Sequence, residues 1–116
     1  MPMRSGISIL SIARSAVPMH RLQKSDLAPG DWVFVKTLRS LYQIRVLDND
    51  LYEVSGGWFD RKRISPTTTG IAGCTWGGTV LHTNVAAACG MCLEFDNRLT
   101  TSLIQHVCVV PHSSLN

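Results

Sequence analysis

Apolar and polar residues alternate over several short stretches of the chain, and this alternation predicts β-strands rather than helices. In the segment 42–46, Tyr-Gln-Ile-Arg-Val, every second side chain is apolar, which is typical of a strand with one buried face. The segment 51–54 predicts the return strand, because residues 48–50 are Asp and Asn, which tolerate left-handed turn conformations. The two strands and their turn predict a β-hairpin that ends at the glycines 56–57.

Other stretches predict strands by composition as well as by alternation. β-Branched and aromatic residues fill 32–35, directly after a Pro-Gly turn at 29–30, and such a run is typical of a strand buried on both faces. A second hairpin is predicted from 91–95 and 99–101. A last strand covers 107–110 and is stopped by the proline that follows it.

Short strands at intervals of about ten residues, with turn residues between them, indicate an all-β fold. We expect an SH3-like or related small β-barrel with a Gly- and Thr-rich insertion, 64–90, between the two hairpins. Within that insertion, 85–88 fits either a helical turn or a flat strand. The expected organisation is a leader or flexible N-terminal segment over 1–25, a single β domain over 26–111 and a tail over 112–116.

Four short motifs carry a resemblance to a known group of proteins. They are GDWVFV at 30–35, GGWF at 56–59, GCTWGG at 73–78 and TTS at 100–102. In this pattern the chain resembles a family of small, uncharacterised bacterial β-proteins, some of them carried on mobile gene cassettes. The resemblance implies an all-β fold and implies no activity.

Composition excludes several classes of protein. The 116 residues are 45% hydrophobic and 16% charged, against about 25% charged in an average chain, which argues against disorder and against a coiled coil. The longest nearly apolar run, 85–93, is shorter than the ~20 residues of a membrane span. Two serines interrupt the apolar stretch 7–13 and Arg14 follows it, which disfavours a secretory signal peptide. We therefore expect a cytoplasmic protein.

The few charges are unevenly distributed along the chain. After Arg63, only Glu94, Asp96 and Arg98 carry a formal charge. We interpret this half as surface that is covered by the chain itself, by a second copy or by a ligand. Homodimer interfaces are more apolar than ordinary surface, and most soluble oligomers are symmetric, so we expect a homodimer.

One segment combines aromatic and basic side chains. Trp58 and Phe59 precede Arg61, Lys62 and Arg63. Aromatic rings stack on unpaired bases and arginines hold phosphates, so this segment predicts single-stranded nucleic-acid binding as an alternative function. The structural interpretation is a core Trp followed by a solvated loop. It is favoured by the expectation that successive strand residues point to opposite faces. The net charge of +3 makes nucleic acid possible without requiring it.

A Gly-rich segment over 70–79 surrounds Trp76 and leads to His82. It is either a tight turn with Trp76 packed across it or the mouth of a small-molecule site with Trp58 and Trp76 as apolar walls. A small enzyme with a pocket near Trp76 and His82 is a further alternative. No catalytic residue is assigned, because Glu94 and Asp96, the one closely spaced acidic pair in this half, flank a turn.

Cys89 and Cys92 form a C-x-x-C element, while Cys74 and Cys108 stand apart from it. Such a pair can chelate zinc or undergo redox chemistry. Buried cysteines that act as small hydrophobes are the favoured interpretation, so no cofactor is expected. If a metal binds, Cys89 and Cys92 are its predicted ligands.

These observations favour a non-enzymatic binding module that self-associates. Its predicted ligand residues are Trp58, Phe59, Trp76 and His82. The alternative nucleic-acid site consists of Trp58, Arg61, Lys62 and Arg63.

Overall fold

The computed structural model describes residues 16–77 and 80–114, and the all-β prediction is confirmed. The described residues include three short helical segments, η2 (Lys24–Asp26), α2 (Gly57–Arg61) and η3 (His112–Ser114). No helix in the described part of the chain is long and apolar enough to cross a membrane. The strands are β1 (Val17–Met19), β2 (Arg21–Gln23), β3 (Trp32–Thr37), β4 (Leu41–Val46), β5 (Tyr52–Gly56), β6 (Thr67–Thr69), β7 (Ile71–Thr75), β8 (Leu81–His82), β9 (Val85–Ala88), β10 (Cys92–Phe95) and β11 (Thr100–Val110).

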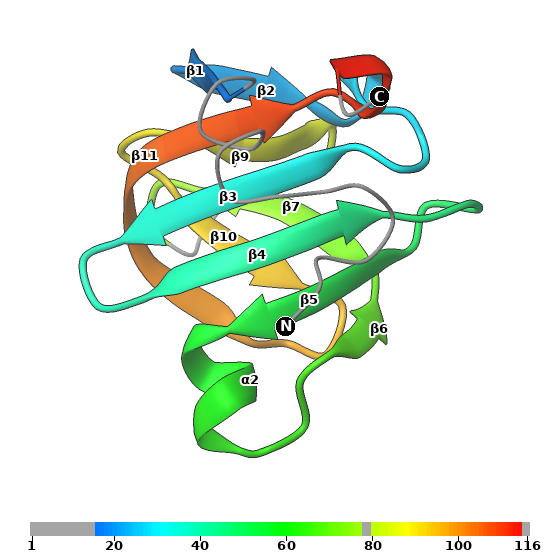
Figure 1. The fold of residues 1–116 in the computed structure, drawn as a ribbon. Coiled ribbons are helices and arrows are strands. Elements are labelled where there is room, and N and C mark those ends of the chain that lie inside the picture. The colour runs from blue at the N-terminus through cyan, green and yellow to red at the C-terminus, as the bar shows by residue number, and fades with distance from the viewer. Residues whose placement is uncertain (1–15, 78–79, 115–116) are drawn as a thin grey trace.

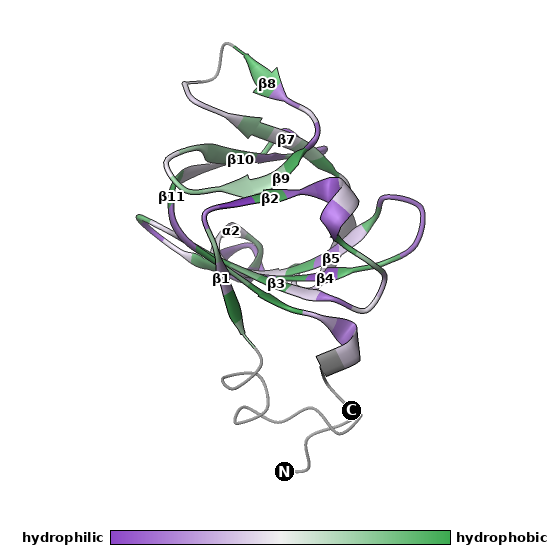
Figure 2. Cartoon of the chain, turned by 90° about the horizontal axis from the view of Figure 1, so that it is seen from above, coloured by the Kyte–Doolittle hydropathy of each residue, from purple (hydrophilic) through white to green (hydrophobic). Residues whose placement is uncertain are grey.

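The strands form two layers that share β11. The larger sheet has the order β6-β5-β4-β3-β11-β10-β7-β8, with β1 also paired to β11, and β2 pairs with β9 in a second sheet. Figure 1 shows β11 curving from the β10 layer to the β3 layer, and Figure 2 shows the layers edge on. Among the described residues this strand order is open, from β6 to β8. Gly70 joins β6 to β7, so the chain itself connects the two layers a second time.

The hairpin of β4 and β5 is confirmed. Residues along β4 alternate between exposed and buried, and Ile44 faces Val54 in an antiparallel register. Asn49 and Asp50 adopt φ angles of 60° and 59° in the turn, the left-handed conformation that their side chains tolerate. Alternation is a reliable signal here because one face of this hairpin covers the core and the other faces solvent.

The prediction that β3 is buried on both faces is wrong. Val33 and Val35 are buried, whereas Trp32 and Phe34 are half-buried on the opposite face. The two rings stack on one another, with centroids 6.1 Å apart and an angle of 12° between their planes. The aromatic residues of β3 therefore stack on its outer face, although their presence in the sequence is typical of a strand buried on both faces.

The predicted short strands near the C-terminus are one long strand, β11. Thr100 and Leu103 pair with β10, and the strand continues to Val110 along β3. A register shift between Ile104 and His106 bends the strand and interrupts the alternation. The alternation of apolar and polar residues is interrupted at this irregularity, whereas the strand continues through it.

Both ends of the described chain contribute more to the fold than expected. β1 and β2 lie before residue 26, where the domain was expected to begin; they pair with β11 and β9, and Leu22 is buried. Residues 1–15 of the expected leader lie outside the described residues. At the other end, the backbone N–H of His112 donates to Asp31 Oδ1 at 2.7 Å, which attaches η3 to the start of β3. Residues 85–88, for which the sequence allowed either a helical turn or a flat strand, form a strand, β9.

Helix α2 was not predicted from the sequence. Gly56 and Gly57 adopt φ angles of 94° and 47°, and these conformations turn the chain out of β5 and into the helix. Phe59 is completely buried and meets Phe95 edge to face, with ring centroids 5.3 Å apart. Its ring also meets Tyr42, at 6.2 Å. Burial of Phe59 against two strands thus stabilises a five-residue helix that would not form alone.

Replacing Gly56 with alanine should destabilise the protein by about 2 kcal/mol or more, because its backbone conformation is restricted to glycine. An alanine Cβ would also overlap the carbonyl oxygen of Leu41. Gly77→Ala is the matched control, since a Cβ at Gly77 meets no atom within 4 Å. Urea denaturation followed by circular dichroism measures both variants. Equal midpoints for Gly56→Ala and Gly77→Ala would contradict this account of the β5–α2 turn.

Candidate binding site beside helix α2

A pocket of about 460 Å³ opens where α2, the β3–β4 connection and the beginning of β11 meet. Three separate segments of the chain line it, so the pocket exists only in the folded protein. Its lining combines two arginines, an indole ring and several hydroxyl groups. The lining residues are Leu38, Arg39, Ser40, Tyr42, Trp58, Arg61, Leu99, Thr100, Thr101 and Ser102.

Trp58 provides the flat apolar surface of this pocket. Its indole is half-buried and packs perpendicular to Phe59, with ring centroids 5.3 Å apart. Its backbone N–H donates to the Tyr42 hydroxyl at 3.4 Å. Lys62 Nζ lies over the ring, 6.0 Å from its centroid. The buried neighbour Phe59 therefore fixes the position of an indole that a ligand can reach.

Two arginines reach the same pocket from different elements. Arg61 Nη1 donates to Ser40 Oγ at 3.2 Å, which links α2 to the β3–β4 connection. The backbone N–H of Arg39 donates to Ser102 Oγ at 3.2 Å, so β11 holds that connection from its other side. Neither arginine has an ion-pair partner among the described residues, where the single ion pair joins Arg45 and Glu53 at 3.9 Å.

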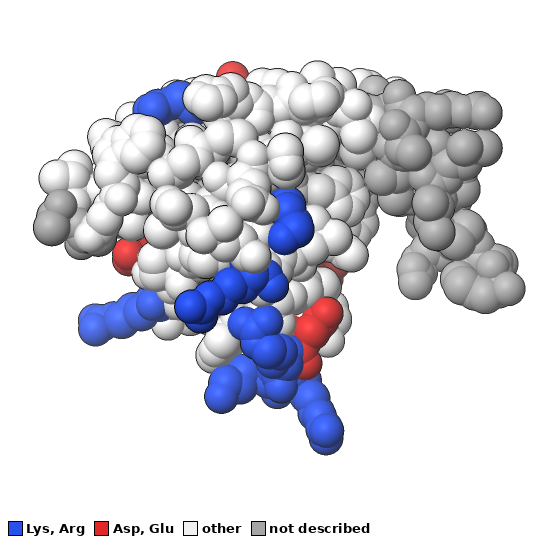
Figure 3. Space-filling model, turned by 90° about the vertical axis from the view of Figure 1, so that its left-hand side faces the viewer, with Lys and Arg blue, Asp and Glu red and all other residues white. Residues whose placement is uncertain are grey.

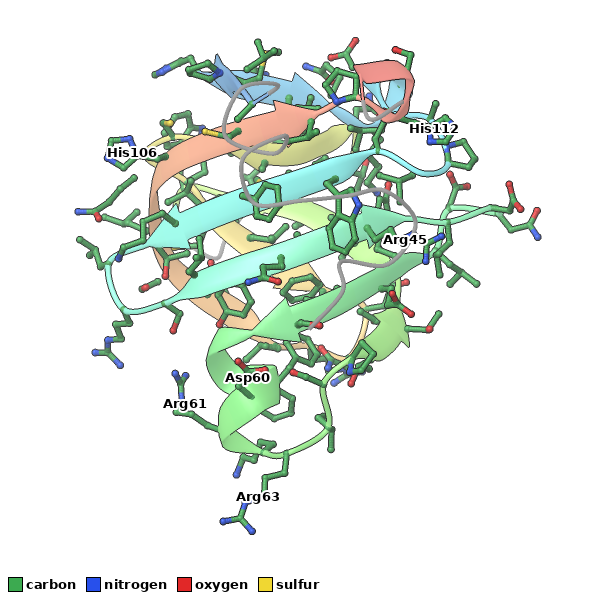
Figure 4. The ribbon with its side chains drawn as sticks, viewed as in Figure 1. Arg45, Asp60, Arg61, Arg63, His106 and His112 are labelled. Carbon is green, nitrogen blue, oxygen red and sulfur yellow. The ribbon has the colours of Figure 1, made fainter. Side chains whose placement is uncertain are left out.

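The carboxylate next to Arg61 in the sequence is directed to the helix start and its following loop. Asp60 Oδ1 accepts hydrogen bonds from the Ser65 hydroxyl and from the backbone N–H of Gly56. These two bonds, the Ser65 one first, lower the pKa of Asp60. Asp60 thereby holds both ends of the α2 segment together, and none of the described residues that line the pocket carries a carboxylate. Figure 4 shows Arg61 and Arg63 extending from α2.

The helix also changes the geometry of the three consecutive cations. On the strand expected from the sequence, Arg61, Lys62 and Arg63 would alternate between two faces and would not form one basic surface. In the structure Arg61 is the last residue of α2, Lys62 still has helical backbone angles and Arg63 adopts a φ of 60°, so the simple two-face alternation of a strand does not apply to them. Arg61 lines the pocket, and Lys62 lies over the Trp58 ring. Both side chains and that of Arg63 are exposed. Figure 3 shows lysines and arginines gathered over the lower part of this face of the molecule.

The other predicted ligand residues lie elsewhere. Phe59 is completely buried in the core, so its side chain positions the site without facing it. Trp76 and His82 line neither of the two pockets described for the structure. Trp76 is 62% exposed rather than packed across a turn. Gly73 brings β7 so close to the backbone of His82 that a Cβ would overlap the carbonyl oxygen, which agrees with a close backbone approach in the Gly-rich segment.

The second pocket, of about 160 Å³, lies around the β4–β5 turn and includes Lys24, Asp48, Asp50 and Tyr52. Burial, then the charges of Asp50 and Asp96, raises the pKa of the Tyr52 phenol. The described residues of its wall include two carboxylates and one cation, whereas those of the first pocket include two arginines and no carboxylate. The second pocket is therefore less suited to an anionic ligand.

All four cysteines are unbridged. Cys89 Sγ contacts the backbone carbonyl oxygens of Gln105 and Met19, at 3.5 and 3.9 Å. Cys74 is completely buried, whereas Cys89, Cys92 and Cys108 are half-buried. Within 16–77 and 80–114 no group of three His, Cys, Asp or Glu side chains could hold a metal ion.

Trp58 and Arg61, which were predicted from the sequence, line this pocket, whereas its other lining residues were not predicted. Arg39 and Ser40 sit in a loop between strands, and Ser102 belongs to a segment whose predicted strand ended there. No local signal connects these residues, because only the tertiary fold brings their segments together.

Comparison with protein-family models, with curated proteins and with solved structures finds no match.

The Cys74 thiol should resist alkylation in the folded protein. Burial raises its pKa from 9.0 to about 12, so at pH 8 it carries roughly a thousandfold less thiolate than an unperturbed cysteine. We expect iodoacetamide to label Cys89, Cys92 and Cys108 in the native state and all four cysteines in denaturant, as measured by peptide mass spectrometry. Native labelling of Cys74 at the rate of the other three would contradict this.

Proposed function

We propose that the protein is a non-enzymatic binding module whose ligand carries a flat ring next to a phosphate, the chemistry of a nucleotide unit. The observation that carries the proposal is that Trp58, Arg39 and Arg61 line one pocket that contains no carboxylate. In this arrangement the ring stacks on Trp58 and the phosphate accepts hydrogen bonds from the arginines, whose guanidinium groups match phosphate geometry.

The stacking energy of a ligand ring on Trp58 exceeds the energy of the Lys62 contact that it would replace. An exposed cation–π contact stabilises by about 0.5–1 kcal/mol, whereas stacking of a base on an aromatic side chain stabilises by about 1–3 kcal/mol. A base can therefore displace the Lys62 ammonium from the indole, and the released ammonium is then free to meet a phosphate. The site loses little by this rearrangement and gains a charge-assisted hydrogen bond.

The remaining wall supports binding rather than catalysis. Ser40, Thr100 and Ser102 present hydroxyl groups, which donate and accept hydrogen bonds to base edges or sugars. No His, Cys, Asp or Glu occurs among the described residues that line the pocket, so this part of the wall lacks the side chains that usually act as general acid or base near neutral pH.

The proposal also covers the type of fold and the cellular compartment. We infer an SH3-like or related small barrel, which is supported by the single-residue link from β6 to β7 and by the donation from the Asp96 backbone N–H to the Gly70 carbonyl at 2.9 Å. We infer a cytoplasmic protein, which is supported by four unbridged thiols, because disulfides form mainly in oxidising compartments.

Arg61→Ala and Trp58→Leu should each weaken binding of a fluorescent oligothymidylate of about ten nucleotides by roughly tenfold, the loss expected for one phosphate contact or one stacked base. Fluorescence anisotropy at low salt measures the affinity, and thermal unfolding checks that each variant folds. Arg45→Ala is the control: it removes the same charge from the other end of β4, where Arg45 pairs with Glu53. Equal effects of Arg45→Ala and Arg61→Ala would reduce the interaction to net charge and defeat the proposal.

A second candidate function, self-association, is favoured by a different observation. Trp76 and Val80 are 62% and 61% exposed, the highest values among the large apolar side chains described, and Leu81 beside them is also exposed. They belong to the hairpin of β7 and β8, and β8 is an edge strand that pairs on one side only. No charged residue occurs between Arg63 and Glu94, so this edge lacks the charges that usually prevent edge-to-edge pairing. We propose that two copies pair symmetrically through β8.

Trp76→Ser should shift the protein toward the monomer if β8 forms this interface, because the substitution removes a large apolar contact without a change of charge. Size-exclusion chromatography with light scattering, over micromolar to millimolar concentrations, measures the shift. Leu51→Ser is the control, since Leu51 is an exposed apolar residue near the β4–β5 turn. A monomeric wild-type protein over the whole range would contradict the interface.

A further inference from the structure

The basic groups beside the pocket exceed what one phosphate requires. Arg39 and Arg61 already line the pocket, and Lys62 and Arg63 follow on the same short segment as exposed side chains. Figure 4 shows Arg63 extending below α2, on the side away from the strands. A free nucleotide held between Arg39 and Arg61 would leave Arg63 without a role in binding.

The fold directs these cations outward rather than to neighbouring acids. Arg63 adopts a φ of 60° and its backbone N–H donates to the Asp60 carbonyl at 3.0 Å. That turn ends the helix and separates the Arg63 side chain from the direction of Arg61. The Asp60 carboxylate is engaged by Ser65 and Gly56. The cations are thus available to a ligand that extends past the pocket.

We infer that the ligand is a single strand of nucleic acid that runs across this face, with one base on Trp58 and successive phosphates on Arg39, Arg61, Lys62 and Arg63. The inference rests on the proposed function, and it adds that the ligand is a polymer rather than a free nucleotide. The path from the β3–β4 connection over α2 follows the basic surface in Figure 3.

The pocket selects an unpaired base. Trp58 is half-buried and lies against Phe59, so a base reaches it only by leaving its own stack. In a duplex this costs unstacking and unpairing, whereas in a single strand the base is already free. Grooves with aromatic rings and basic side chains are the usual means of binding single strands without sequence preference.

An acidic peptide is the competing occupant, because it also matches a basic surface. It offers carboxylates to the arginines but no flat ring for Trp58. A polyglutamate of comparable charge therefore separates attraction between charges from base stacking, and we expect it to bind at least tenfold more weakly than oligothymidylate.

The decisive experiment compares thymidine monophosphate with oligothymidylates of increasing length and with a duplex of the same length. Binding is measured by calorimetry at several salt concentrations. Affinity should rise at least tenfold from the monophosphate to about four nucleotides and then level off. The slope of log K against log salt should reach about −2.8 for the longer oligomers, since each phosphate neutralised on a single strand contributes about −0.7, and it should be much shallower for the monophosphate, which has no condensed counterions to release. The duplex should bind more weakly than the single strand.

Arg63→Ala provides the matched variant. It should lower the affinity of the oligomer more than that of the monophosphate and reduce the salt slope of the oligomer by about 0.7. Arg45→Ala should change neither slope, because Arg45 pairs with Glu53 at the other end of β4. A thermal melt of each variant confirms that it is folded.

The outcomes separate the inference from the proposed function. Equal affinity for monophosphate and oligomers, or an oligomer slope that Arg63→Ala leaves unchanged, would overturn the single-strand path and leave a nucleotide site intact. Equal binding of the duplex or of polyglutamate would overturn it as well. Absence of binding to every probe at low salt would overturn both the inference and the proposed function.

Discussion

The burial of Phe59 between Tyr42 and Phe95 is the interaction that connects the candidate site to the rest of the fold. Tyr42 comes from β4 in one layer and Phe95 from β10 in the other, and Phe59 has no exposed surface. Burial of such a side chain stabilises by about 1.5–3 kcal/mol, and each edge-to-face aromatic pair adds about 0.5–1.5 kcal/mol. These contributions offset part of the cost of ordering a five-residue helix. Because α2 is fixed at Phe59, its helical geometry also fixes where Trp58 and Arg61 lie.

Charge around the site is controlled by hydrogen bonding as much as by composition. A carboxylate beside an arginine in sequence would ordinarily neutralise it, but the Asp60 carboxylate accepts from the Gly56 backbone and from Ser65. The same two bonds stabilise the turn that introduces α2 and the loop that follows it. One acidic side chain thereby stabilises the element that carries the cations and leaves the pocket wall free of negative charge. Stability of the segment and the positive potential of the pocket have a common origin.

The sequence predicted the elements whose signal is local and missed those that depend on distant contacts. The β4–β5 hairpin follows from strict alternation and from turn residues suited to positive φ. Helix α2 follows Gly56 and begins at Gly57, and glycine disfavours helix formation, so the helix depends on the burial of Phe59 and on the hydrogen bonds of Asp60. β11 was divided in two because its bend at Ile104–His106 shifts the alternation. Arg39 and Ser102 are far apart in the sequence, and they line one pocket because the fold places the β3–β4 connection beside β11.

The scarcity of charge after Arg63 has two physical origins. Much of that half is interior: β9 is buried along its whole length, and Cys74 and Met91 have no exposed surface. Neutral residues there are required by the core and carry no information about a partner. The exposed apolar remainder is concentrated at Trp76, Val80 and Leu81. Stable interfaces bury roughly 1,000 Å² or more, and three exposed side chains offer few contacts, so pairing through β8 would be weak and would depend on protein concentration. The half before Ile64 supplies Trp58 and both arginines of the pocket, and the start of β11 adds neutral residues to the same wall. We therefore expect the ligand to bind where the two halves of the chain meet, and the scarcity of charge after Arg63 does not mark this place.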